Sequence, residues 1–91
     1  MTLEARLRAL WLEQLPSRWG ADPAFWWKGR EIVHTHGDVV EIRLTRKGIR
    51  DLDDERAMLR ARHSDWVIVA KEHEELICAL AERARDLNGA D

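Results

Sequence analysis

The sequence around residues 30–45 constrains the fold of this chain most, because it predicts a β-hairpin with one buried face. Apolar and polar side chains alternate there, and His36-Gly37 in the middle is typical of a tight turn. A two-residue turn at these positions pairs His34 with Val39. One face of the predicted hairpin then carries Glu31, Val33, Val40, Ile42 and Leu44, and the other carries Ile32, His34, Val39, Glu41 and Arg43. The first set is mostly apolar, so we expect it to face the helices.

Strand and helix signals elsewhere predict three helices and two further strands. The predicted helices span 3–15, 45–63 and 71–87, and the predicted strands span 24–28, 30–35, 38–45 and 65–70. Thr45 is placed to cap the second helix, whereas Gly48 favours a later start near Asp51. The fold class is therefore α+β, with the order α-β-β-β-α-β-α and a four-stranded, mainly antiparallel sheet packed against helices. We expect residues 1–91 to form a single domain.

Length and charge limit the partners that suit such a chain. A protein of 91 residues has a small hydrophobic core. We therefore expect a homodimer interface to contribute to the apolar burial. The net charge of −2 argues against nucleic acid as a partner, and the absence of any long apolar run argues against a membrane. A single cysteine, Cys78, and an N-terminus without a secretory signal predict a cytoplasmic protein. We interpret Cys78 as a packing residue of the last helix.

Tryptophan dominates the aromatic content, with five tryptophans beside one phenylalanine. We expect Trp11 and Trp66 in the core. Trp26 and Trp27 are adjacent on a strand and must face opposite ways, so one of them lies on the mixed face. Together, Trp26, Trp27, Ile32 and Val39 are candidates for an apolar partner surface. The alternative is that Trp11 and Trp19 fold over that face.

A His-x-His pattern, His34 and His36, is the chief candidate for a site. Residues two apart on a strand share a face, so the two imidazoles can hold one metal ion, such as zinc. Further ligands are available in Glu31, Asp38, Glu41 and His63. If His36 lies in the turn, however, it no longer points with His34. A pocket for a small ligand is the other interpretation, with its candidate residues Glu31, His34, His36 and Arg43.

The remaining motifs indicate no cofactor. The sequence contains no zinc-finger spacing, phosphate-binding loop or dinucleotide-binding glycine pattern. A basic run at Arg46, Lys47 and Arg50 lacks interleaved aromatic residues, so we interpret it as a solvated helix face.

The run from Gly29 to Asp38, together with Ile42-Arg43-Leu44-Thr45 and Ser64-Asp65-Trp66-Val67, resembles a small bacterial family whose members carry the label "luciferase domain". The resemblance extends from Trp26 to Leu87. The chain is shorter than that family's pattern between Arg62 and Ser64. The resemblance implies no defined reaction, because a flavin luciferase barrel needs far more residues.

These observations lead to two hypotheses. The first is a non-enzymatic binding or interaction module, a homodimer through the tryptophan surface, with a protein or small molecule as its partner. The second is a small-ligand or metal site built on the His-x-His strand, and this hypothesis includes a catalytic site. We place the first ahead because the sequence contains no recognisable catalytic triad.

Overall fold

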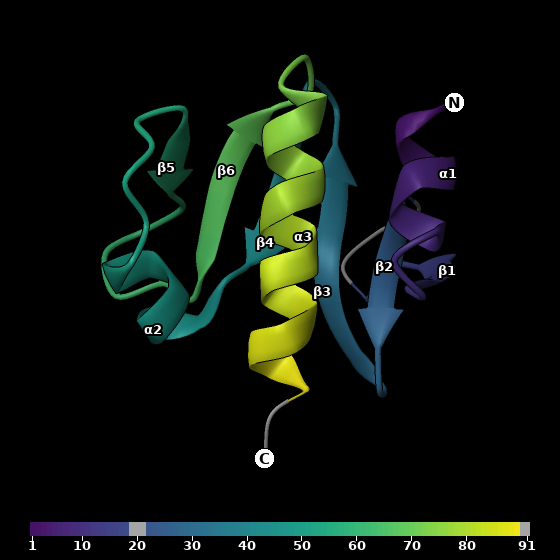
Figure 1. The fold of residues 1–91 in the computed structure, drawn as a ribbon, viewed down its shortest axis with the longest axis horizontal. Helices are drawn as coiled ribbons and strands as arrows, with labels where there is room; N and C mark the ends of the chain where they lie inside the picture. The colour runs from purple at the N-terminus through teal and green to yellow at the C-terminus, as the bar shows by residue number, and fades with distance from the viewer. Residues whose placement is uncertain (19–21, 90–91) are drawn as a thin grey trace.

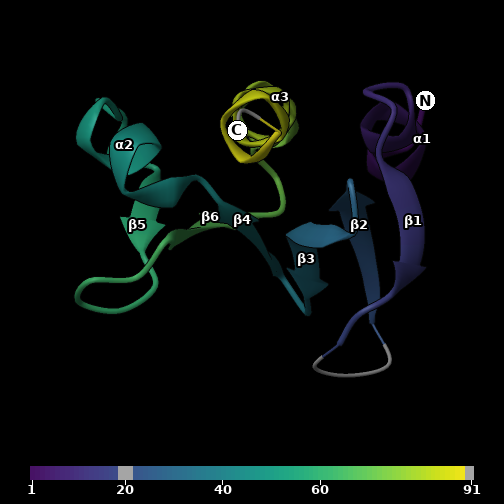
Figure 2. The same ribbon diagram turned by 90° about the horizontal axis from the view of Figure 1, so that it is seen from below.

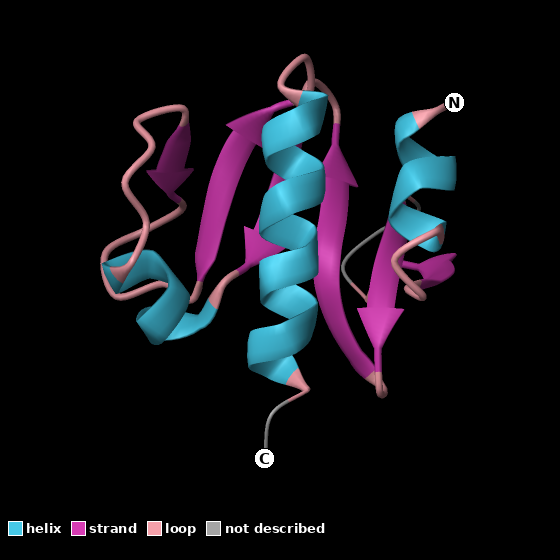
Figure 3. Cartoon of the chain, in the orientation of Figure 1, coloured by secondary structure: helices cyan, strands magenta, loops and turns pink. Residues whose placement is uncertain are grey.

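A computed structural model describes residues 1–18 and 22–89, and it shows one antiparallel sheet with helices on one side only (Figures 1, 2 and 3). The elements are α1 (Leu3–Arg8), β1 (Glu13–Pro16), β2 (Pro23–Trp27), β3 (Arg30–His36), β4 (Val39–Arg43), α2 (Thr45–Arg50), β5 (Ala57–Leu59), β6 (Trp66–Ala70) and α3 (Glu74–Asn88). The strand order is β1-β2-β3-β4-β6-β5. The α+β class with an antiparallel sheet and three helices is confirmed, but the described sheet has six strands rather than four.

The core lies between this sheet and the helices, as expected for the apolar face of the hairpin. Its fully or almost fully buried residues include Leu3 and Leu7 of α1, Phe25 of β2, Val33 of β3, Val40 and Ile42 of β4, Leu44, Val67 and Val69 of β6, and Ile77 and Ala81 of α3. The packing of the first and last helices on this face is therefore confirmed. The opposite face of the sheet carries no helix within the described ranges, and we call it the open face (Figure 2). Among the described helices, none combines the length and the apolar character that crossing a bilayer requires.

The first helix is shorter than predicted, because the chain turns after Arg8. Trp11 has a φ of 72° and is 81% exposed, so the prediction of a core position for it is wrong. Leu12 returns to the core, and the next four residues pair with β2 as the edge strand β1. Pro16 is tolerated there because an edge strand has ladder positions where no amide donor is needed.

The predicted second helix also ends early, at Arg50, and its C-terminal part becomes β5. Asp54 explains the break. Its carboxylate accepts from the backbone amide of Arg56 at 3.0 Å, a local bond that competes with helical hydrogen bonding. The hydrogen bonds from the side chain and the backbone of Arg56 lower the pKa of Asp54 to about 2. Residues 57–59 can then pair with β6.

The hairpin forms one residue away from the predicted register. Gly37 and Asp38 form the turn, and Gly37 has a φ of 61°, as the first central position of a type II′ turn requires. His36 therefore belongs to β3 and pairs with Val39, while His34 pairs with Glu41.

A β-bulge in β3 changes which side chains face the core. Trp26 pairs with Glu31 and Phe25 pairs with Val33, so Ile32 is an extra residue in the strand. Both Ile32 and Val33 are fully buried in the core cluster, although they are adjacent. The predicted placement of Ile32 on the open face and of Glu31 on the core face is therefore wrong for both residues.

This placement predicts that Ile32→Ala lowers the free energy of unfolding by about 2–5 kcal/mol, because it leaves a cavity in the core. Val39→Ala is the matched control on the half-buried side of the hairpin, and its cost is roughly 1 kcal/mol. Urea denaturation of both variants measures the difference. If both variants lowered the free energy of unfolding by the same small amount, the core position that the bulge gives Ile32 would be contradicted.

Candidate functional site

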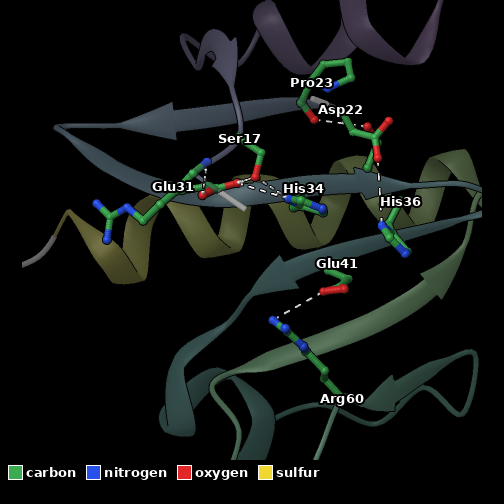
Figure 4. A network of polar contacts seen from close by, with 10 residues as sticks. Ser17, Asp22, Pro23, Glu31, His34, His36, Glu41 and Arg60 are labelled. Atoms are coloured by element: carbon green, nitrogen blue, oxygen red, sulfur yellow. Dashed lines mark hydrogen bonds and ion pairs between the residues drawn. The ribbon is translucent and has the colours of Figure 1, made fainter. Parts of the chain in front are cut away.

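A buried polar network forms where the bulge brings Glu31 beside His34, three residues along the strand (Figure 4). The hydroxyl of Ser17 donates to Oε1 of Glu31 at 2.7 Å and lies 2.8 Å from Nδ1 of His34. Nδ1 of His34 is 3.2 Å from the same carboxylate oxygen. All three residues are buried, so each contact is made with little competition from water.

This network sets the tautomer of His34. A carboxylate only accepts hydrogen bonds, and the Ser17 proton is already donated to Glu31. Nδ1 of His34 must therefore carry its hydrogen and donate it, which leaves a lone pair on Nε2 in the neutral ring. The arrangement does not match a serine-protease relay, because Ser17 and Glu31 contact the same ring nitrogen rather than opposite ones.

His36 lies on the same side of the sheet as His34. Their ring centroids are 5.9 Å apart, and Nδ1 of His36 is 3.9 Å from Oδ2 of Asp22 (Figure 4). The structure thus brings the two histidines together with a carboxylate from the segment before β2. None of the further ligand candidates from the sequence, Glu31, Asp38, Glu41 and His63, belongs to this group of described residues. His63 is 3.1 Å from Arg46 instead.

Next to the histidines is a pocket of about 290 Å³ surrounded by arginines. Its lining residues are Arg18, Gly29, Arg30, Glu31, Arg43, Arg60 and Trp66. A smaller hollow of about 190 Å³ continues past Arg60 and Trp66 to both histidines and Glu41. Four arginines and one glutamate line the larger pocket, and this excess of positive charge favours an anion.

Trp66 forms an aromatic surface between two of these arginines. The guanidinium carbons of Arg43 and Arg60 lie 5.3 Å and 6.0 Å from its ring centroid. Trp66 is half-buried on the open face, so the core position predicted for it is wrong. Glu41 pairs with Arg60 at 3.4 Å, which holds that side chain near the pocket (Figure 4).

The C-terminal helix supports the pocket from the other side of the sheet. The buried Asn88 donates to the carbonyl of Arg43 at 2.9 Å and accepts from Nη1 of Arg30 at 3.3 Å. One amide thus holds the backbone at Arg43 and the side chain of Arg30. The sequence predicted only a helix end at Asn88.

The predicted apolar partner surface does not form. Trp27 packs against the core and lies over the end of α3, with Arg85 5.9 Å from its ring, and Ile32 is buried. Trp26 and Val39 are half-buried. The predicted contact of Trp19 with this face lies outside the described residues.

The exposed large apolar side chains among the described residues lie elsewhere, on the edge strands β1 and β5, at Met1 and at Trp11. Met58 of the edge strand β5 is 67% exposed, and Leu15 of β1 is also exposed. A homodimer stays a prediction.

Several residues of this site have no signal in the sequence. Ser17, Arg18 and Asp22 lie between the predicted helix 3–15 and the predicted strand 24–28, and Arg60 falls in the predicted helix 45–63. Only the pairing of Arg43 with Trp66 could have been predicted from the sequence. Both of their strands are predicted, and the correct register between the two strands places these residues opposite each other. Comparison of the chain with protein-family models, with curated proteins and with solved structures finds no match. The resemblance to the luciferase-domain family therefore stays a prediction, and geometry alone indicates what the site does.

Cys78 lies outside this site, on α3, and burial raises the pKa of its thiol above the ordinary value. A higher pKa means less thiolate near neutral pH, and the thiolate is the reactive form. We expect iodoacetamide to alkylate native Cys78 more slowly than a cysteine in an unstructured peptide. Mass spectrometry over time measures the rate, and unfolding in urea should abolish the difference. A native rate equal to the peptide rate would contradict this expectation.

Proposed function

We propose that the open face of the sheet binds a small anionic ligand carrying phosphate or carboxylate groups. The proposed pocket is the arginine-lined one, and its volume of about 290 Å³ suits a small molecule rather than a polymer. Arginine is well matched to both anions, because its planar fork donates two parallel hydrogen bonds.

The observation that carries this proposal is the state of Arg43. Within residues 1–18 and 22–89, its Nε is shielded from solvent and has no hydrogen-bond partner. A buried donor without an acceptor costs about 1–3 kcal/mol, and more when it is charged. If the Arg43 side chain turns toward the pocket, a bound anion would supply the missing acceptor. Arg43 is also among the ligand-binding residues that the sequence indicated, together with Glu31.

The alternative, an apolar interaction module, has less support. It needs Trp26, Trp27, Ile32 and Val39 on one surface, and Ile32 and Trp27 pack on the core side. The positive pocket favours a ligand site over that module.

We expect inorganic phosphate or succinate to bind in a saturable way and to shift the indole N–H resonance of Trp66 in ¹H–¹⁵N NMR spectra. Trp66→Phe assigns that resonance. Running the two anions separately distinguishes phosphate from carboxylate recognition. Affinity should fall as salt is added, because the attraction is partly electrostatic. The absence of a saturable shift for both anions up to about 10 mM would overturn the proposal.

Arg60→Ala should weaken anion binding roughly 10–100-fold, because one charge-assisted contact is worth about 1.5–3 kcal/mol. Arg83→Ala is a matched control. The Arg60 and Arg83 side chains are 48% and 47% exposed, and each lies 3.4 Å from one carboxylate. Titration of both variants with the anion that binds tests the site. Equal losses in the two variants would indicate a general charge effect rather than a pocket.

A further inference from the structure

We infer that Asp22, His34 and His36 form a binding site for a divalent transition-metal ion, with zinc as its reference occupant. This inference goes beyond the proposed anion pocket and does not depend on it. The three residues come from the segment before β2 and from β3, and they meet on the open face (Figure 4). Two imidazoles and one carboxylate are a common ligand set for zinc and for iron(II).

The spacing of the ligand atoms fits an ion after a small movement. One ligand atom from each residue lies within 4.8 Å of the other two. Ligands on a tetrahedral zinc ion, at bonds near 2.0–2.1 Å, are about 3.3 Å apart. The side chains of His36 and Asp22 are 70% and 55% exposed, so both can close this gap by turning about their side-chain bonds. His34 is buried and supplies the fixed point.

The buried network prepares His34 for this role. Ser17 and Glu31 hold its Nδ1–H, so the lone pair on Nε2 is the one that a metal can use. A carboxylate behind the distal nitrogen of a ligating histidine orients the ring and raises its basicity. Glu31 is therefore a positioning residue for the metal, and its buried charge gains a partner when the ion binds.

The site also leaves room for a fourth ligand. The hollow of about 190 Å³ beside His34 and His36 opens toward Arg60 and Trp66. Three protein ligands with one open position resemble the arrangement of zinc sites that bind water or a substrate. Among the described residues, this group has three members, and no further histidine, cysteine or carboxylate provides a fourth protein ligand.

Isothermal titration of the untagged full chain with Zn²⁺ tests the inference. We expect a dissociation constant at or below about 1 μM for one ion per chain. His36→Ala and Asp22→Asn should each raise it at least tenfold, and both variants should keep the native circular dichroism spectrum because these side chains are exposed. His63→Ala is the control, since His63 is an exposed histidine that contacts Arg46 instead. Its affinity should not change.

Two further measurements separate ligation from a merely structural role of the network. Imidazole ¹⁵N shifts should show the Nδ1–H tautomer of His34 without metal and perturbation at Nε2 on adding Zn²⁺. Glu31→Gln should weaken Zn²⁺ binding 10–100-fold, the effect typical of a lost carboxylate behind a ligating histidine. The inference is overturned if the chain shows no saturable Zn²⁺ binding below about 10 μM. It is equally overturned if His36→Ala and Asp22→Asn bind as tightly as the native chain.

Discussion

One extra residue in β3, Ile32, determines how the two faces of this sheet are divided. Regular alternation along the strand would place Glu31 with Val33 against the helices, where a carboxylate would be buried among apolar side chains. The bulge moves Glu31 to the open face and gives the core two adjacent apolar residues. The same shift brings Glu31 within hydrogen-bond distance of His34. The core packing and the polar network therefore depend on the same local irregularity.

The two faces of the sheet contribute in different ways. The covered face supplies most of the apolar burial, through the contacts of α3 with β3 and β4 and of α1 with α3. The open face gathers charge, with arginines from the ends of several elements around Trp66. Like charges at close range repel, so such a cluster is costly without a counter-ion. Asn88 holds the side chain of Arg30 and the backbone of Arg43, and Glu41 holds the side chain of Arg60, so two of these arginine side chains are fixed rather than freely solvated.

The accuracy of the sequence predictions varies between elements, for identifiable reasons. The hairpin strands and the C-terminal helix follow from the periodicity of their apolar residues, and the strand beginning at Trp66 follows from its short apolar run. The two extra strands, β1 and β5, are short and lie at the sheet edges, and β1 is exposed throughout. Their formation depends on pairing with a neighbour rather than on their own pattern. The local bond between Asp54 and Arg56 then outweighs the helical signal that surrounds it.

The sequence by itself determined that this is an α+β protein, that Val33, Val40, Ile42 and Leu44 face the helices, and that His34 and His36 are chemically notable. These features depend on the spacing of neighbouring residues, which a sequence contains. The tertiary structure alone decided that Asp22 and Ser17 join the histidines, and that arginines from four separate segments line one pocket with Trp66. Such contacts arise from strand register and from a single-residue bulge. A shift of one residue exchanges the two faces of a strand, so these contacts follow only when every strand is paired correctly.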